Sequence, residues 1–273
     1  MRRLLFLVIW MGWFLPLSAQ SVLPLQSFGA RSIGMGGVKH YVLDSWSIFN
    51  HIGALDRVAQ SMVSANFDQR FGIKELSTMG LSGIWKNSFG TAGIGVARFG
   101  SSLFNQQMLG LGFSNTMGVV SIGAKLDWHQ TKIECFGSGQ AWMFTFGGVA
   151  ELSPEFFIGA QVTNVNQARF SRFSENRLPS SVQLGIAYVP FSSTKVIVET
   201  EKPLEGDPIV RIGLEHSLKN RIYLRTGASS DPTRIHFGVG IRRDWFGFDY
   251  ALGQQTTLGH SHHFSLIFQL DAK

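Results

Sequence analysis

Alternation of apolar and polar residues is the feature that most constrains how this chain can fold. From Val120 to His129 every second residue is apolar, and the residues between them are small or polar. The segments 210–215, 235–242 and 264–270 repeat this pattern. A period of two places each set of side chains on one face of a β-sheet. The sequence therefore predicts an all-β protein.

Turn-forming residues divide the chain into fourteen expected strands, with twelve as the alternative. The expected strands are 58–68, 75–86, 89–99, 104–114, 118–130, 139–151, 155–165, 180–190, 194–202, 208–217, 220–229, 233–243, 244–253 and 261–270. Tight connections, such as 86–88 and 243–244, alternate with longer ones at 131–138, 166–179 and 254–260. This alternation is typical of transmembrane β-barrels, in which an even strand number places both termini on the periplasmic side.

A soluble β-sandwich would show the same alternation with its apolar face turned inward. The composition favours a transmembrane antiparallel β-barrel, because only 15% of the residues are charged while the chain holds 31 Gly and 23 Phe. The low charge and abundant Phe also exclude a disordered chain. The longest uncharged stretch, 99–124, contains Ser, Asn and Gln side chains that a membrane helix would expose to lipid.

The alternation also assigns side chains to the lipid. We expect the following residues to face lipid: Val120, Ile122, Leu126, Phe237, Val239, Phe264, Leu266 and Phe268. Trp85, Trp128 and Trp142 fall near strand ends or in upper halves, where the two membrane interfaces favour aromatic rings.

The first nineteen residues are expected to be a signal peptide and not part of the fold. Arg2 and Arg3 precede an apolar run, Leu4–Trp13, and Leu17–Ala19 ends in a small residue. An uncleaved anchor helix is the alternative.

The formal net charge of +6 includes the two arginines, and no basic run carries interleaved aromatic residues, so nucleic acid is not an expected partner.

Residues 20–57 lack long alternating runs but contain many apolar residues and the glycine cluster 34–37. A fourteen-stranded barrel has a lumen too wide for its own side chains to fill. We therefore expect 20–57 to form a hatch inside a barrel made by 58–273, with a periplasmic tail as the alternative. Arg31 should pair with an acid of the lumen wall, and the candidates are Glu199, Glu201, Glu215 and Asp249.

Two stretches near the N-terminus carry a family resemblance. The run Gly29–Gly37, followed by Asp44–Asn50, resembles the start of the PorV/PorQ-type outer-membrane proteins of Bacteroidetes, relatives of the FadL/OMPP1-like barrels. The continuation 51–55 departs from the family pattern, whereas the C-terminal stretches 248–252 and 258–266 resemble it. The resemblance implies a barrel with a hatch in the outer membrane of a Gram-negative, Bacteroidetes-like cell.

The same resemblance implies two functions. The first is an accessory or interaction barrel linked to type IX-like protein secretion, with outer-membrane lipid and secretion-machinery components or secreted proteins as partners. The alternative is a FadL-like channel for a small hydrophobic molecule.

No residue pattern predicts catalysis, a cofactor or a metal site, so we expect no enzyme activity and assign no site residues. His262 and His263 would point to opposite faces of a strand and cannot share one ion. Gly93–Gly95 and Gly110–Gly112 do not complete a nucleotide-binding fingerprint. The single cysteine, Cys135, excludes an intramolecular disulfide and a Cys-rich zinc site.

Charges of both signs gather on the expected lumen faces of five strands between 194 and 253. They are Lys195, Glu199, Glu201, Arg211, Glu215, Arg221, Arg225, His236, Arg242 and Asp249. Ion pairs between strands that brace the wall and hold the hatch are the simpler interpretation. The other is a selectivity lining for an anionic solute, with a carboxylate on Arg211 or Arg225.

Overall fold

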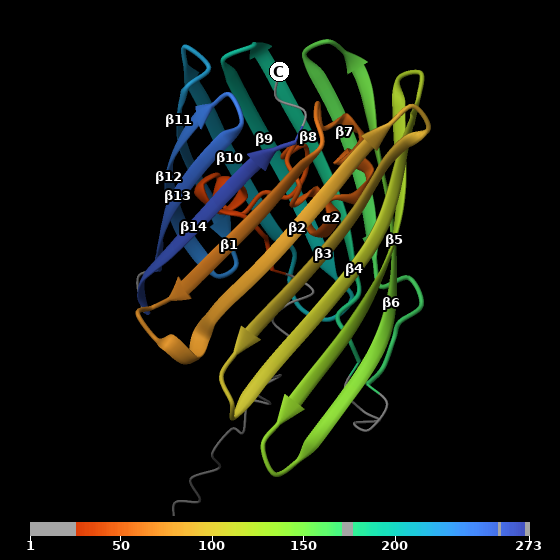
Figure 1. The fold of residues 1–273 in the computed structure, drawn as a ribbon, viewed down its shortest axis with the longest axis vertical. Helices are drawn as coiled ribbons and strands as arrows, with labels where there is room; N and C mark the ends of the chain where they lie inside the picture. Colours follow the sequence, from red (N-terminus) through yellow and green to blue (C-terminus); the bar gives the residue numbers. More distant parts are fainter. Residues whose placement is uncertain (1–25, 171–176, 256–257, 271–273) are drawn as a thin grey trace, which may run out of the picture.

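Fourteen antiparallel strands close a barrel in the computed structural model, which describes residues 26–170, 177–255 and 258–270. Each strand pairs with its neighbours in sequence, and β1 pairs with β14 to complete the ring (Figure 1). The prediction of a closed antiparallel barrel with fourteen strands is confirmed. The expected signal peptide, 1–19, lies outside the described residues.

The predicted strand bounds agree with the structure within two residues, except at the start of β1 and the ends of β4 and β5. The strands are β1 (Met62–Arg70), β2 (Ser77–Asn87), β3 (Gly90–Gly100), β4 (Phe104–Met117), β5 (Val120–Ile133), β6 (Gly137–Ser153), β7 (Phe156–Thr163), β8 (Ser181–Phe191), β9 (Thr194–Pro203), β10 (Ile209–Leu218), β11 (Ile222–Ser230), β12 (Thr233–Arg243), β13 (Phe246–Gln255) and β14 (Gly259–Gln269). The loop expected at 131–138 is too long, because β5 and β6 continue into it and only 134–136 connect them. These two strands extend beyond their neighbours at this end of the barrel (Figure 1).

Four short helices complete the described chain: α1 (Ala30–Gly34), α2 (Ser47–Asn50), η1 (Ile52–Arg57) and η2 (Lys74–Leu76). Within the described residues, none of the helices has the length and apolar character needed to cross a membrane.

The connections differ between the two ends of the barrel. At one end, here the tight-turn end, the strands are joined by 88–89, 118–119, 154–155, 192–193, 219–221 and 244–245. At the other, the long-loop end, they are joined by 71–76, 101–103, 134–136, 164–180, 204–208, 231–232 and 256–258. The chain leaves β14 at the tight-turn end (Figure 1).

Apolar side chains cover the outside of the wall, whereas polar ones face inward. On β12, Ile235 and Phe237 are 52% and 53% exposed, whereas His236 between them is 6% exposed. Every residue that we expected to face lipid is exposed or half-buried on the outer face. Trp85 lies near the tight-turn end of β2, while Trp128 and Trp142 pair toward the long-loop end. An apolar outer face and a polar inner face are the reverse of a soluble β-sandwich, whose apolar faces meet in the core.

Candidate functional site

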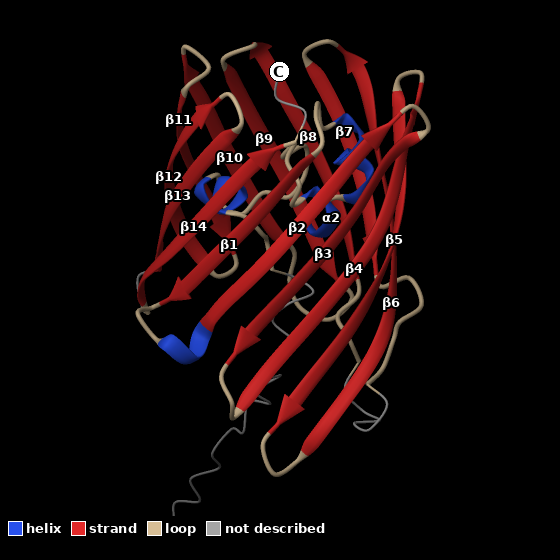
Figure 2. Cartoon of the chain, viewed as in Figure 1, coloured by secondary structure: helices blue, strands red, loops and turns tan. Residues whose placement is uncertain are grey.

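The segment 26–57, here called the lumen segment, lies inside the barrel. Figure 2 shows α1, α2 and η1 within the ring of strands. Its long apolar side chains are buried, including Trp46, Ile48, Ile52 and Leu55. The segment touches the inner face of the wall on all sides, from β1 to β14.

Glycine occupies twelve of the wall positions that face the lumen segment. A Cβ at Gly213 would lie 2.5 Å from the carbonyl oxygen of Met35, and one at Gly123 would lie 2.5 Å from that of Ile52. The glycines of the wall that meet the segment are Gly80, Gly93, Gly95, Gly110, Gly112, Gly123, Gly147, Gly159, Gly185, Gly213, Gly227 and Gly238. These strand glycines mark close approach of another backbone or ring.

The glycines of the lumen segment make the reciprocal contacts in part. A Cβ at Gly36 would lie 2.7 Å from backbone atoms of Ile212 and Ala228, and one at Gly34 would lie 3.0 Å from Gly238. Both glycines approach the wall closely. Gly37 has a φ of 76° and meets Ser27 of its own segment first, so its role is a turn and not wall contact.

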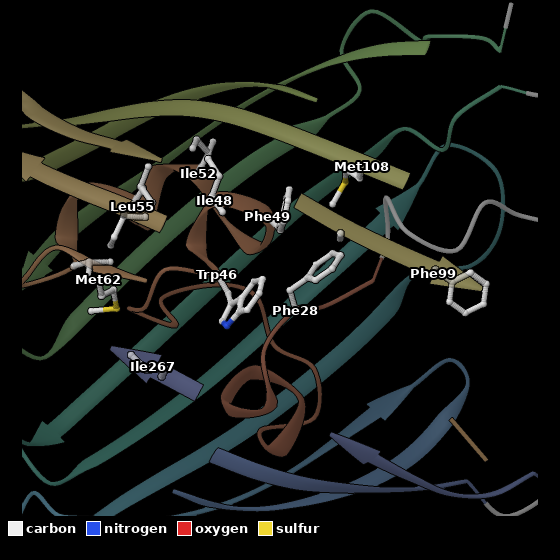
Figure 3. Close-up of a cluster of buried hydrophobic side chains, with 13 residues drawn as sticks. Phe28, Trp46, Ile48, Phe49, Ile52, Leu55, Met62, Phe99, Met108 and Ile267 are labelled. Carbon is white, nitrogen blue, oxygen red and sulfur yellow. The ribbon is translucent and has the colours of Figure 1, made fainter. Parts of the chain in front are cut away.

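An apolar half of the lumen segment, 46–57, is anchored by a hydrophobic cluster. The cluster contains Ile48 and Phe49 of α2, Ile52 and Leu55 of η1, and Trp46 directly before α2 (Figure 3). The wall contributes Met62, Ile84, Ala97, Phe99, Met108 and Ile267. Burial of these side chains away from water supplies a non-directional attraction that fixes this half.

A polar half, 30–44, is held by two ionic clusters. In the first, Lys39 Nζ lies 2.9 Å from a carboxylate oxygen of Glu201. Arg211 Nη1 donates to Glu199 at 2.9 Å and to Glu201 at 2.8 Å. A carboxylate oxygen of Glu199 also accepts the backbone N–H groups of Lys39 and His40, at 2.7 and 2.8 Å.

The second ionic cluster joins α1 to β10, β11, β12 and β13. Arg31 donates to both carboxylate oxygens of Glu215, at 2.6 and 2.8 Å, which confirms one of its predicted partners. Arg225 bridges Glu215 and Asp249, at 2.7 and 2.6 Å. Arg242 donates to Asp249 at 2.9 Å. Paired charges of this kind tolerate burial because each compensates its neighbour.

The ionic clusters contain most of the predicted lumen charges. Lys195 is half-buried and its Nζ lies 5.1 Å from the centre of the Tyr41 ring. Arg221 was wrongly placed, because it lies in an exposed turn and not on the inner face. Sequence reasoning missed Lys39, whose partners could not be read from a segment without strand periodicity.

Burial sets the protonation of two groups in the lumen segment. It raises the pKa of Asp44 to about 6, although Arg31 opposes this shift. It lowers the pKa of His40 to about 4, so this imidazole is neutral at pH 7. The His40 ring fills the space left by Gly159 and Gly185.

Two cavities flank the polar half of the lumen segment. The cavity toward the long-loop end holds about 400 Å³, and Ile33, Gly36 and Gly37 line it. The cavity toward the tight-turn end holds about 990 Å³, and Arg31 and Asp44 line it. Residues 31–37 therefore lie between two spaces that are each large enough for a small molecule.

The two histidines near the C-terminus are separated as expected. His263 Nδ1 lies 3.0 Å from Asp68 inside the barrel, whereas His262 Nδ1 lies 2.8 Å from the Tyr250 hydroxyl on the outside. Among the described residues, no three His, Cys, Asp or Glu side chains are grouped to hold a metal ion. Cys135 lies exposed in the connection between β5 and β6.

No protein-family model matches the chain, and none of the curated proteins matches it. Solved structures do. The toluene transporter TodX of P. putida is 14% identical and has a TM-score of 0.63, over 89% of this chain and 97% of that one. A Pseudomonas aeruginosa FadL homologue is 11% identical and has a TM-score of 0.59, over 88% and 98%. The chain has the fold of FadL-type barrels.

A third match shows the same architecture more coarsely. The outer-membrane protein Omp33 of Acinetobacter baumannii is 10% identical and has a TM-score of 0.53, over 77% of this chain and 98% of that one. At these identities the matches establish the fold, and function must be argued from the lumen itself.

Proposed function

We propose that the protein is an outer-membrane channel for a small hydrophobic molecule, which the lumen segment closes as a hatch. The observation that carries the proposal is the pair of cavities on either side of residues 31–37. Movement of this short stretch alone would join them into one path. The solved structures with this fold that are named as a toluene transporter and a hydrocarbon channel agree with this function.

The proposed location follows from the outer surface. The outward faces of all strands carry large apolar side chains, which a bilayer would cover and water would not favour. A signal peptide at 1–19 would export the chain, and 58–273 would insert as the barrel. Residues 20–57 would then enter the lumen from the periplasmic side.

The accessory role in type IX-like secretion has weaker support. It depends on the resemblance at Gly29–Gly37 and Asp44–Asn50, and the structure gives those motifs a packing role. Asp44 Oδ1 accepts the N–H of Trp46 at 3.0 Å. Asn50 bonds to both the N–H and the carbonyl of Phe28, at 2.8 Å each. These hydrogen bonds stabilise the shape of the lumen segment, and the presence of Asp44 and Asn50 is explained without a protein partner.

Conductance in planar bilayers would test the channel. We expect the intact protein to conduct little and a variant lacking 28–57 to conduct at least ten times more. Arg31→Gln combined with Lys39→Gln should give an intermediate conductance. Lys74→Gln, an exposed change outside the lumen, is the matched control. Unchanged conductance after the deletion, in a barrel that still folds, would rule out closure by the lumen segment.

Uptake by cells would test the solute. A Gram-negative host that makes the protein should take up radiolabelled toluene faster than the same host without it. A host that makes the variant Arg31→Gln with Lys39→Gln should take it up faster still. Equal rates in all three strains would contradict the proposed transport. Capture of a large secretion complex together with the barrel would instead favour the accessory role.

A further inference from the structure

Two arginines of the long-loop cavity lie outside the ionic clusters. Arg70 ends β1 and Arg234 lies near the start of β12, and both line the cavity of about 400 Å³. Among the residues that the structure describes, neither guanidinium makes an ion pair. Arg211, which lines the same cavity, is neutralised by Glu199 and Glu201.

Neutral groups hold the two guanidiniums in place. Arg234 Nε donates to Gln255 Oε1 at 2.9 Å, and its guanidinium lies 6.0 Å from the centre of the Phe71 ring. The Arg70 guanidinium lies 5.7 Å from the centre of the Phe99 ring. Aromatic faces attract these cations without removing their charge. The cavity wall therefore presents two positioned positive charges that make no direct ion pair among the described residues, and Asp68 and Asp231 act on them only from beyond ion-pair distance.

A buried imidazole beside them also lacks a partner. His236 is 6% exposed and lines the cavity, and its Nδ1 has no hydrogen-bond partner among the described residues. His263, on the same wall, uses its Nδ1 on Asp68. A polar atom left unpaired in a protein interior is costly. A ligand oxygen near Arg234 would give His236 Nδ1 its missing partner.

The remaining lining limits the kind of anion. Phe71, Ile33, Ile209 and Pro232 supply apolar surface. Phe71 adopts a φ of 54°, a left-handed conformation that is uncommon for a bulky residue and often occurs at ligand sites. Asp231 also lines the cavity and opposes a second negative charge on the ligand. These features favour a monoanion with an apolar body over a phosphate.

We propose that this cavity binds a small organic carboxylate, with its oxygens between Arg70, Arg234 and His236 and its apolar body against Phe71 and Ile33. The inference rests on the proposed channel function and refines it, because it adds a carboxylate to the kinds of hydrophobic molecule that can bind at the long-loop end. Bidentate pairing with a guanidinium fork gives a carboxylate its preferred geometry.

Calorimetric titration of the full chain in detergent would test this site with benzoate as the probe. Benzyl alcohol, of similar shape but neutral, and inorganic phosphate are the comparison ligands. We expect benzoate to bind at least ten times more tightly than either. Arg70→Gln with Arg234→Gln should weaken benzoate at least tenfold and leave benzyl alcohol unchanged, and His236→Gln should weaken benzoate several-fold. Lys74→Gln should change nothing.

Three results would overturn the proposal. They are benzoate binding no tighter than benzyl alcohol, benzoate binding that the double variant leaves unchanged, and phosphate binding as tight as benzoate. Arg70→Lys with Arg234→Lys separates loss of charge from misfolding, since it should retain part of the affinity. The titration is independent of transport: loss of benzoate binding leaves the conductance result intact, whereas absence of flux leaves the binding result intact.

Discussion

Glycines on the inner face of the wall determine where the lumen segment can lie. Gly185 on β8 leaves the space that the His40 ring fills, and a Cβ there would lie 2.5 Å from the imidazole Cγ. Backbone atoms of the lumen segment cannot move aside as a flexible side chain can. Each wall glycine therefore specifies where the segment lies.

Gly185→Val should destabilise the folded protein by about 1–3 kcal/mol, because overpacking forces the ring or the wall to shift. Unfolding in urea, followed by the change in gel mobility of the unboiled barrel, would measure the loss. Ala160→Val, on the outer face of the adjacent strand, is the matched control and should change stability little. Equal stability of the two variants would show that the His40 contact is not a constraint.

The elements of the barrel could be predicted from the sequence, but the contacts of the lumen segment could not. Period-two alternation predicted the strands because a wall between lipid and lumen imposes it, and the turn-forming residues divided them into fourteen. It failed at 131–138, where β5 and β6 rise beyond the rim. The lumen segment has no such period, and its partners Glu199, Glu201 and Glu215 lie more than a hundred residues away along the chain. The paired glycines at 93–95 and 110–112 were the available signal for its contact surface.

The two halves of the lumen segment should differ in local stability. The ionic half is held by paired charges in addition to the buried side chains of Met35, Val38 and Tyr41. Removal of one partner from a buried pair costs about 3–5 kcal/mol. Arg31→Gln with Lys39→Gln should therefore speed amide hydrogen exchange in 30–39 at least tenfold. Amides of 46–56, which the hydrophobic cluster anchors, should change little.

Exchange measured by mass spectrometry on the intact protein in detergent would separate the halves. Arg57→Gln is an informative comparison, because Arg57 pairs with Glu151 beside the apolar half and does not touch 30–39. Uniform acceleration across 30–56 would mean that the lumen segment opens as one unit, and a gate confined to 31–37 would then be wrong.

The whole molecule has two different faces: an apolar outer face surrounds a largely polar lumen, which contains the lumen segment. The first ionic cluster balances two cations with two carboxylates, whereas the second holds three arginines and two carboxylates. Arg70 and Arg234 lie outside both clusters. Ion pairs therefore brace the lumen on the side of β9 to β13, whereas Arg70 and Arg234 line the long-loop cavity without an ion pair among the described residues.

Membrane placement of the outer face can be measured along β14. Leu266 and Leu270 both point outward, but Leu266 lies within the strand whereas Leu270 lies beyond its end at the rim. A cation near the bilayer midplane costs about 2–4 kcal/mol and one near an interface about 0–1 kcal/mol. Leu266→Arg should therefore destabilise the protein in lipid vesicles more than Leu270→Arg does, by about 2 kcal/mol. Reversible urea unfolding in vesicles, followed by tryptophan fluorescence, would give both values. Equal costs would place the two positions at the same depth and displace the bilayer from the middle of the strands.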